Sequence, residues 1–208
     1  MPRGGEARTQ ARREEIISAC ETLYAERGFK DVTIKDIGER TSFTRTSIYN
    51  YFETKEEIFL ALLHREYQGW TADLTALSEA KDRGTEPLSR GLAASLDRRQ
   101  TMLRLMSTSL FEMEENSRVE ALAAFKQAFY AMRRALEACV LAHCPGADAN
   151  GFLFTFLPFV YGVYPYSTVT EKQRAAMAQA GVDYHPPTVY DMVYRGAMTI
   201  LEGLKNQQ

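Results

Sequence analysis

The segment from Val32 to Phe59, VTIKDIGERTSFTRTSIYNYFETKEEIF, constrains the fold of this chain more than any other. Thr33 followed by Asp36 predicts a capped helix start, because the threonine hydroxyl can accept an N–H of the first turn. Ile34 and Ile37 supply the inward face of this short helix. The segment therefore opens with a helix of about two turns.

A second short helical pattern begins near Thr44 and has Ile48, Tyr49 and Phe52 as its apolar side. The opposite side is rich in hydrogen-bond donors, namely Arg45, Thr46, Ser47, Asn50 and Tyr51. Two short helices joined by a tight turn predict a helix-turn-helix motif, whose second helix can lie in the major groove of DNA.

A longer third helix is predicted from Thr54, since Thr54 and Glu57 have the spacing of a capping box. Its apolar positions recur every three or four residues from Phe59 to Leu77. This helix is the obvious mechanical link between the motif and the remainder of the chain.

These residues resemble the DNA-binding domain of the TetR family of bacterial repressors. The resemblance covers roughly the first quarter of the chain and rests on residue type and spacing at Ile16, Ile17, Ala19, Leu23, Tyr24, Gly28, Phe29, Thr33, the Thr41–Thr44 turn, Tyr49, Tyr51, Phe52 and Lys55. Two positions depart from the family pattern. Gly38 replaces the usual alanine, which should loosen its helix by up to about 1 kcal/mol. Ser42 stands where the family favours glycine, at a tight turn.

The resemblance implies an all-α fold with two parts: a three-helix helix-turn-helix DNA-binding domain, residues 1–55, and a helical effector-binding and dimerisation domain, residues 56–208. It also implies a ligand-responsive transcriptional regulator, expected to be a repressor that leaves its operator when a small molecule binds the C-terminal domain. An activator or a ligand-independent regulator of the same fold is an alternative. A helical interaction module without DNA binding is another.

Ten residues are candidates for DNA contacts. Arg45 and Asn50 suit the edges of guanine and adenine. The residues that could reach bases or phosphates are Thr46, Ser47 and Tyr51, and those expected at phosphates or at the start of the recognition helix are Thr33, Lys35, Thr44, Tyr49 and Lys55. Structural alternatives stay open: Tyr49 as a core residue, and Lys35 and Asn50 as solvated helix residues.

The composition of the 208 residues excludes other classes. A hydrophobic fraction of 45% can form a sizeable core, and a net charge of −2 argues against indiscriminate coating of nucleic acid.

The three cysteines predict reduced thiols in a cytoplasmic protein without a bound metal. A site of Cys139, His143 and Cys144 is the weaker interpretation, because a fourth ligand is missing. No apolar run is long enough for a signal peptide or a membrane-spanning helix.

The rest of the chain is also predicted to be helical. Residues 1–9 are basic and uncapped, which favours a solvated arm over one that follows a phosphate backbone. Helices are expected over residues 10–27, from Thr85, over residues 100–114, from a capping box at Ser117 and Glu120, over residues 150–164 and 170–181, and from Pro187.

The helices expected over residues 150–164 and from Pro187 are apolar around most of their circumference. One neighbouring helix each could not cover all of this apolar surface. A four-helix interface with the same pair from a second copy would bury the excess, and the resemblance implies the same homodimer. The expected interface residues are Phe152, Phe156, Phe159, Val189, Val193, Ala197, Ile200 and Leu204. They could instead complete the core of one chain. A dimer would place two recognition helices about 34–36 Å apart, in successive major grooves.

A set of large side chains is expected to face the interior of the C-terminal part: Tyr67, Trp70, Met106, Leu110, Phe111, Phe125, Phe129 and Tyr161. Each of them could be a core residue. The resemblance implies that together they enclose a small-molecule effector, which would be largely apolar or aromatic.

The histidines offer no catalytic motif. His64, His143 and His185 lie near no GxSxG, HExxH or glycine-rich phosphate sequence, so we expect neither catalysis nor a cofactor. The expected partners are double-stranded operator DNA, a second copy of the chain and an unidentified effector, with no membrane.

Overall fold

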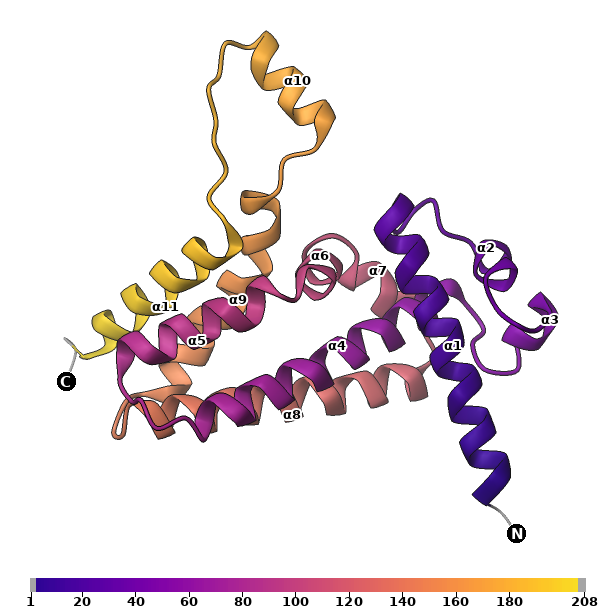
Figure 1. The fold of residues 1–208 in the computed structure, drawn as a ribbon, viewed down its shortest axis with the longest axis horizontal. Helices are drawn as coiled ribbons and strands as arrows, with labels where there is room; N and C mark the ends of the chain where they lie inside the picture. Colours follow the sequence, from indigo (N-terminus) through magenta and orange to yellow (C-terminus); the bar gives the residue numbers. More distant parts are fainter. Residues whose placement is uncertain (1–2, 206–208) are drawn as a thin grey trace. The chain divides into compact units, whose positions relative to one another are not determined.

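The computed structural model describes residues 3–205, drawn as a ribbon in Figure 1. Every regular element in this range is a helix. The chain divides into two compact units: Met1–Glu66 with Ser109–Phe129, and Tyr67–Thr108 with Tyr130–Gln208. The all-α architecture is confirmed, and residues 109–129 join the first unit although nothing in the sequence indicated it.

The first unit contains α1 (Arg3–Arg27), α2 (Ile34–Glu39), α3 (Arg45–Ile48), α7 (Leu110–Glu115) and the N-terminal parts of α4 (Lys55–Ser78) and α8 (Val119–His143). Ile37 of α2 and Ile48 of α3 are fully buried, as is Phe59 of α4. The rings of Tyr24 and Phe29 lie 5.4 and 4.7 Å from the Phe59 ring, centroid to centroid. An aromatic cluster thus fixes the end of α1 against α4.

The N-terminal segment differs from the sequence-based expectation. α1 begins at Arg3 rather than near residue 10, so residues 3–9 are helical and do not form a separate arm. Ala7 and Arg8 are good helix formers, and Glu6 is an acidic residue in the first turn, where it favours the helix dipole. Met1 and Pro2 lie outside the described residues.

The single helix expected over residues 100–114 is wrong. Its place is taken by α6 (Gln100–Thr108) and α7, and the break falls at Ser109, whose backbone is not helical (φ −143°, ψ −1°). Because α7 starts with a new helical phase, Phe111 is 83% exposed instead of facing an interior.

The capping box expected at Ser117 is also wrong. α8 begins at Val119, and the Ser117 hydroxyl donates to the carbonyl oxygen of Met113 at 2.7 Å. This hydroxyl satisfies a carbonyl at the end of α7 instead of an N–H at the start of α8.

The second unit contains the remaining parts of α4 and α8 together with α5 (Thr85–Asp97), α6, α9 (Ala149–Ser167), α10 (Glu171–Gln179) and α11 (Val189–Lys205). α11 packs against α5 and α9, and α9 packs against α6. Trp70 is fully buried and donates its indole N–H to the Ser95 hydroxyl at 3.2 Å.

Residues 168–188, which we call the α10 arm, leave this packing between α9 and α11 (Figure 1). A capping box joins Thr170 and Gln173, and Tyr184 donates to the carbonyl oxygen of Tyr166 at 2.9 Å. No residue of α10 is buried, so this helix has no packed face in the single chain. A nine-residue helix has little stability on its own in water.

Within residues 3–205, no single helix is both long and apolar enough to cross a membrane. Only α9 and α10 taken together, with a bend of 68° between them, meet the requirement by length and composition.

Candidate nucleic-acid interface

The start of α2 follows the sequence prediction. The Asp36 N–H donates to the Thr33 hydroxyl oxygen at 3.2 Å, and the Thr33 N–H donates to the Asp36 carboxylate at 2.9 Å. The Thr33 hydroxyl in turn donates to this carboxylate at 2.6 Å. These hydrogen bonds from Thr33 hold the pKa of Asp36 below its ordinary value. Thr33 therefore caps α2, and its hydroxyl proton is already donated to the Asp36 carboxylate.

The turn between α2 and α3 is held by Glu15 of α1, a residue that the sequence did not single out. The Glu15 carboxylate accepts the backbone N–H of Ser42 at 2.5 Å and the Ser42 hydroxyl at 3.1 Å. No non-glycine residue in the described part of the chain has a positive φ. Ser42 therefore occupies the turn without backbone strain, and its side chain adds a hydrogen bond that glycine could not make.

Gly38 lies where α2 and α3 approach each other. A Cβ atom at this position would be 3.2 Å from both Cα and Cβ of Arg45. This separation is tighter than an ordinary van der Waals contact between carbon atoms. The glycine therefore allows the two helices to meet closely, at the cost of lower helix propensity.

The recognition helix is shorter than expected. α3 spans only Arg45–Ile48, and the N–H groups of Asn50 and Tyr51 donate to carbonyl oxygens three residues earlier, at 3.3 and 2.8 Å. Thr44 is the N-cap residue, but its hydroxyl pairs with the Ser47 hydroxyl at 3.1 Å instead of capping the backbone. One α-turn followed by tighter turns replaces the two helical turns predicted, since serine, threonine, asparagine and tyrosine are weak helix formers. We call residues 44–51 the recognition segment.

Most of the ten candidate residues are exposed: Thr33, Lys35, Thr44, Arg45, Thr46, Tyr49 and Asn50. The half-buried ones are Ser47, Tyr51 and Lys55. Tyr49 is 46% exposed and accepts a hydrogen bond from Arg45 at 3.4 Å, so the core interpretation of Tyr49 is wrong.

Two arginines of α1 hold the end of the recognition segment. Arg12 donates to the Tyr51 hydroxyl at 3.5 Å, and its guanidinium lies 5.3 Å from the Phe43 ring centroid. Arg13 donates to the Tyr51 carbonyl oxygen at 3.2 Å and lies 4.4 Å from the Phe52 ring centroid. The orientation of Tyr51 is thus set by α1 through contacts with no short-range sequence signal.

Lys55 lies at the start of α4 and contacts the end of the α1 region. Its ammonium group donates to the carbonyl oxygens of Phe29 and Lys30 at 3.1 and 3.4 Å and lies 4.7 Å from the Phe29 ring centroid. Lys55 therefore ties two elements together, and a phosphate contact by this residue stays a prediction.

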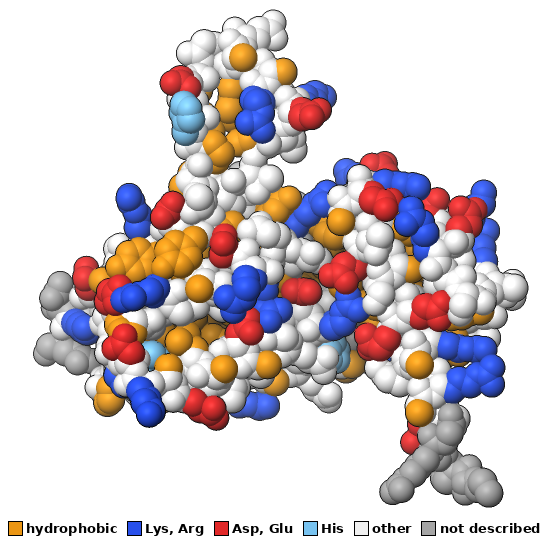
Figure 2. All heavy atoms as spheres, in the orientation of Figure 1, with side chains coloured by type: hydrophobic (Ala, Val, Ile, Leu, Met, Phe, Trp, Pro, Cys, Tyr) orange, Lys and Arg blue, Asp and Glu red, His pale blue; other side chains and the backbone are white. Residues whose placement is uncertain are grey.

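Charges of both signs are interspersed on the face that Figure 2 shows. Arg27 pairs with Asp36 at 3.3 Å, and Arg40 pairs with Glu26 at 3.2 Å. Arg45 makes no ion pair with any residue between 3 and 205, so its guanidinium remains available to an external acceptor.

The residues expected around an effector are divided between the two units. Tyr67, Trp70 and Met106 are buried in the second unit, and Phe125 is buried in the first. Leu110, Phe129 and Tyr161 are half-buried, whereas Phe111 is exposed for the reason given above.

The residues expected at a dimer interface are largely covered within one chain. Those buried in the second unit are Phe152, Phe156, Val189, Val193 and Ala197, and those half-buried are Phe159, Ile200 and Leu204. The apolar side chains that α9 leaves open are others. Phe154 is 84% exposed and Tyr166 is 65% exposed, and Pro158 and Pro165 are exposed as well.

The fold and the recognition segment define a helix-turn-helix protein with an additional helical unit. Residues 16–62 match the family described as "Bacterial regulatory proteins, tetR family", and residues 64–208 match "Tetracyclin repressor-like, C-terminal domain". The chain therefore belongs to the TetR family of bacterial regulatory proteins.

Curated relatives match part of the chain. The HTH-type transcriptional repressor KstR2 of Mycolicibacterium smegmatis is 29% identical over 80 residues, which cover 38% of this chain and 38% of the relative. KstR2 of Rhodococcus jostii is 30% identical over 98 residues, covering 47% and 41%. The HTH-type transcriptional repressor AcnR of Corynebacterium diphtheriae is 30% identical over 66 residues, covering 32% and 35%. The chain thus spans less than half the length of each of these relatives.

Solved structures share the fold over nearly the whole chain. A TetR/AcrR family regulator from Thermobifida fusca has a TM-score of 0.63 at 18% identity, covering 93% of this chain and 98% of that one. The fatty acid degradation regulator FadR from Bacillus halodurans has a TM-score of 0.59 at 16% identity, covering 92% and 98%.

Proposed function

We propose that this protein is a transcriptional repressor that binds operator DNA as a homodimer and is released when a small molecule binds. The observation that carries the proposal is the exposed Arg45 guanidinium, which makes no ion pair within residues 3–205, on a recognition segment held by Glu15, Arg12 and Arg13. A fixed backbone places its donors in register with base edges before DNA arrives. The relatives named as repressors support the sign of the regulation.

Selection of bound fragments from random DNA tests DNA recognition directly. We expect recovery of a sequence with two-fold symmetry and half-sites about 10–10.5 base pairs apart, centre to centre, or a multiple of that spacing. Recovery of unrelated fragments, all bound equally well, would contradict the proposal. A reporter gene carrying the selected sequence distinguishes a repressor from an activator, since only a repressor lowers its expression.

A second copy of the chain is the proposed cover for the open apolar surface of the second unit. Homodimers are typical of the family, and Phe154 and Tyr166 on α9 and Val182 and Tyr184 on the α10 arm are exposed in the single chain. Burial of large apolar side chains is the main driving force for association. The interface would then use the outward neighbours of Phe152 and Phe156 on the same helix.

Sedimentation of Phe154→Asp tests this interface. We expect the dimer dissociation constant to rise at least about tenfold, because a carboxylate would be buried at the contact. Phe111→Asp is the matched control, since Phe111 is equally exposed but belongs to the first unit. Equal dimerisation of the two variants would exclude α9 from the contact.

The cytoplasm is the proposed location. Cys20, Cys139 and Cys144 are all free and buried, which suits a reducing compartment. Burial raises the pKa of Cys139 to about 12 and raises the pKa of Cys20 as well, so these thiols are poor nucleophiles.

A further inference from the structure

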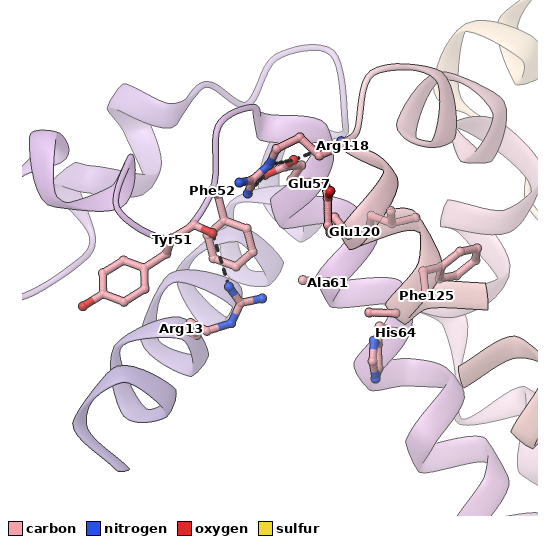
Figure 3. A pocket seen from close by; sticks show the side chains of 12 residues that line it. Arg13, Tyr51, Phe52, Glu57, Ala61, His64, Arg118, Glu120 and Phe125 are labelled. Atoms are coloured by element: carbon pink, nitrogen blue, oxygen red, sulfur yellow. Dashed lines mark hydrogen bonds and ion pairs between the residues drawn. The ribbon is translucent and has the colours of Figure 1, made fainter. Parts of the chain in front are cut away.

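A cavity of about 250 Å³ lies within the first unit, beside the end of the recognition segment (Figure 3). Its walls come from α1, the residues after α3, the first part of α4 and the start of α8. Leu60, Ala61, Ala124 and Phe125 form its apolar part. Of the residues that could reach bases, only Tyr51 lines it.

One end of the cavity carries the Arg13 guanidinium, a positive group that pairs with no acid in the described part of the chain. Arg13 contacts only neutral groups there, the Tyr51 carbonyl oxygen and the Phe52 ring, and no acid within residues 3–205 pairs with it. His64 also lines the cavity and is half-buried. Burial, followed by the charge of Arg13, lowers the pKa of His64, against an opposing effect of Glu14. The charge of Arg13 therefore reaches His64, on the other side of Ala61.

The other end is neutral or acidic. Arg118 is occupied there by Glu57, through Nε at 2.6 Å and Nη2 at 2.8 Å, and by Glu53 at 3.2 Å. Glu120 also lines this end. An anion would be repelled from these carboxylates and attracted to Arg13, so the cavity can orient a ligand with one negative group.

We infer that this cavity binds a small organic carboxylate, with its negative group at Arg13 and His64 and its apolar body against Leu60, Ala61 and Phe125. The guanidinium of Arg13 can offer a carboxylate two parallel N–H donors. The volume lies near the lower limit of ligand sites, which suits a single ring or a short chain. The sequence predicted a largely apolar effector bound in the C-terminal part. The ligand inferred here also carries an acidic group, and its binding site lies in the first unit.

Ligand binding here would act on the recognition segment directly. The same guanidinium donates to the Tyr51 carbonyl oxygen, so a bound carboxylate that draws the guanidinium into the cavity would weaken this hydrogen bond. Loss of this hydrogen bond loosens the end of the segment that meets DNA. This consequence rests on the proposed function, whereas binding itself does not.

The experiment uses the full-length protein, with benzoate as the probe and benzylamine as a control of similar size and opposite charge. Imidazole resonances are followed by NMR, and His64 is assigned from the signal lost in His64→Gln. We expect benzoate to shift the His64 resonance and to raise its pKa, because a nearby anion favours the imidazolium. His185, 86% exposed in the second unit, should not respond.

Arg13→Gln should weaken benzoate binding by about tenfold or more, as expected for loss of a charge-assisted hydrogen bond. Arg13→Lys keeps the charge but loses the paired donors, and it should show an intermediate affinity. Arg90→Gln is the control: Arg90 pairs with Glu86 in the second unit, so its loss should leave benzoate binding unchanged. Thermal melts of each variant confirm folding.

An unshifted His64 resonance, equal affinity of Arg13→Gln and wild type, or equal binding of benzylamine would each overturn the inference. DNA selection without benzoate separates this result from the proposed function. Sequence-selective DNA binding with no benzoate binding refutes the carboxylate site alone. Benzoate binding by a protein with no DNA preference supports the site and refutes the regulator.

Discussion

The Glu57 carboxylate is 1% exposed and accepts hydrogen bonds from the guanidinium of Arg118, which lies 61 residues later in the chain. It also accepts the backbone N–H groups of Glu53 at 2.9 Å and of Arg118 at 3.1 Å. The Glu57 N–H itself donates to the Thr54 hydroxyl, as the sequence predicts, but the side chain turns to Arg118 and Glu53 instead of back to Thr54. A helix-capping residue thus also joins the start of α4 to the start of α8.

Glu57→Gln should lower the free energy of unfolding by about 1–3 kcal/mol at neutral pH, because one amide oxygen cannot satisfy all these donors. The loss is smaller than for a fully buried pair, since the Arg118 side chain is 45% exposed. Urea unfolding measures the change. Glu53→Gln is the control, because Glu53 meets the same guanidinium but is 59% exposed, and it should cost no more than about 0.5 kcal/mol. Equal stability of the two variants would show that the buried Glu57 carboxylate stabilises the fold no more than the exposed Glu53 carboxylate does.

The same carboxylate should make stability depend on pH. Burial favours its protonated form, but the hydrogen bonds from Arg118 and from the N–H groups of Glu53 and Arg118 outweigh burial and hold the pKa of Glu57 below its ordinary value. A depressed folded-state pKa stabilises the fold above the unfolded value, about 4.3, and this stabilisation is lost as pH falls through the folded value. The stability difference between wild type and Glu57→Gln should therefore be constant between about pH 6 and 7 and close below about pH 4. Unfolding curves at three pH values test this, and a gap that widens in acid would contradict it.

The sequence predicted those parts of the candidate interface that depend on local patterns. The caps at Thr33 and Thr54 and the buried positions of Ile37 and Ile48 follow from spacing alone, since they involve residues three or four apart. The break between α6 and α7 at Ser109 could not be predicted from the sequence, because serine is tolerated within helices.

Contacts between distant residues were beyond the reach of these patterns. Glu15 meets Ser42 across 27 residues, and Glu57 meets Arg118 across 61. Such pairs become visible only when the helices are packed. The residues that orient the recognition segment were therefore missed, although the sequence had named as candidates most of the residues that this segment exposes.

Arg45→Ala should relax sequence preference at one base pair by about 1–3 kcal/mol while leaving binding to random DNA nearly unchanged. Lys35→Ala should instead weaken all sequences alike and lower the salt dependence by about one ion, because Lys35 is 70% exposed and only loosely paired with Glu39 at 3.9 Å. Competition binding at several salt concentrations separates the two effects. Equal losses on specific and random DNA for Arg45→Ala would remove its assignment to a base.

Lys55→Ala should reduce stability as well as DNA binding. Its ammonium group donates to two backbone carbonyl oxygens at the end of the α1 region, and their loss should cost about 1 kcal/mol in the free energy of unfolding. Urea unfolding and DNA titration on the same preparation test this, with Lys35→Ala as the control for charge alone. A DNA defect in Lys55→Ala without any loss of stability would indicate a direct phosphate contact instead.

The α10 arm offers a test of association that needs no substitution in the core. Lys172 and Arg174 lie on α10, which has no buried residue in the single chain, so trypsin should cut after them rapidly in the monomer. If a second copy covers the arm, the cleavage rate should fall as protein concentration rises through the dimer dissociation constant, since only the open fraction is cut. Cleavage after Arg45, which is exposed in the first unit, serves as the internal reference and should not slow. Phe154→Asp should keep the arm sensitive at every concentration. The ratio of the cleavage rate in the arm to the cleavage rate after Arg45 is the quantity to follow. If this ratio does not change with protein concentration, the arm stays uncovered when two chains associate.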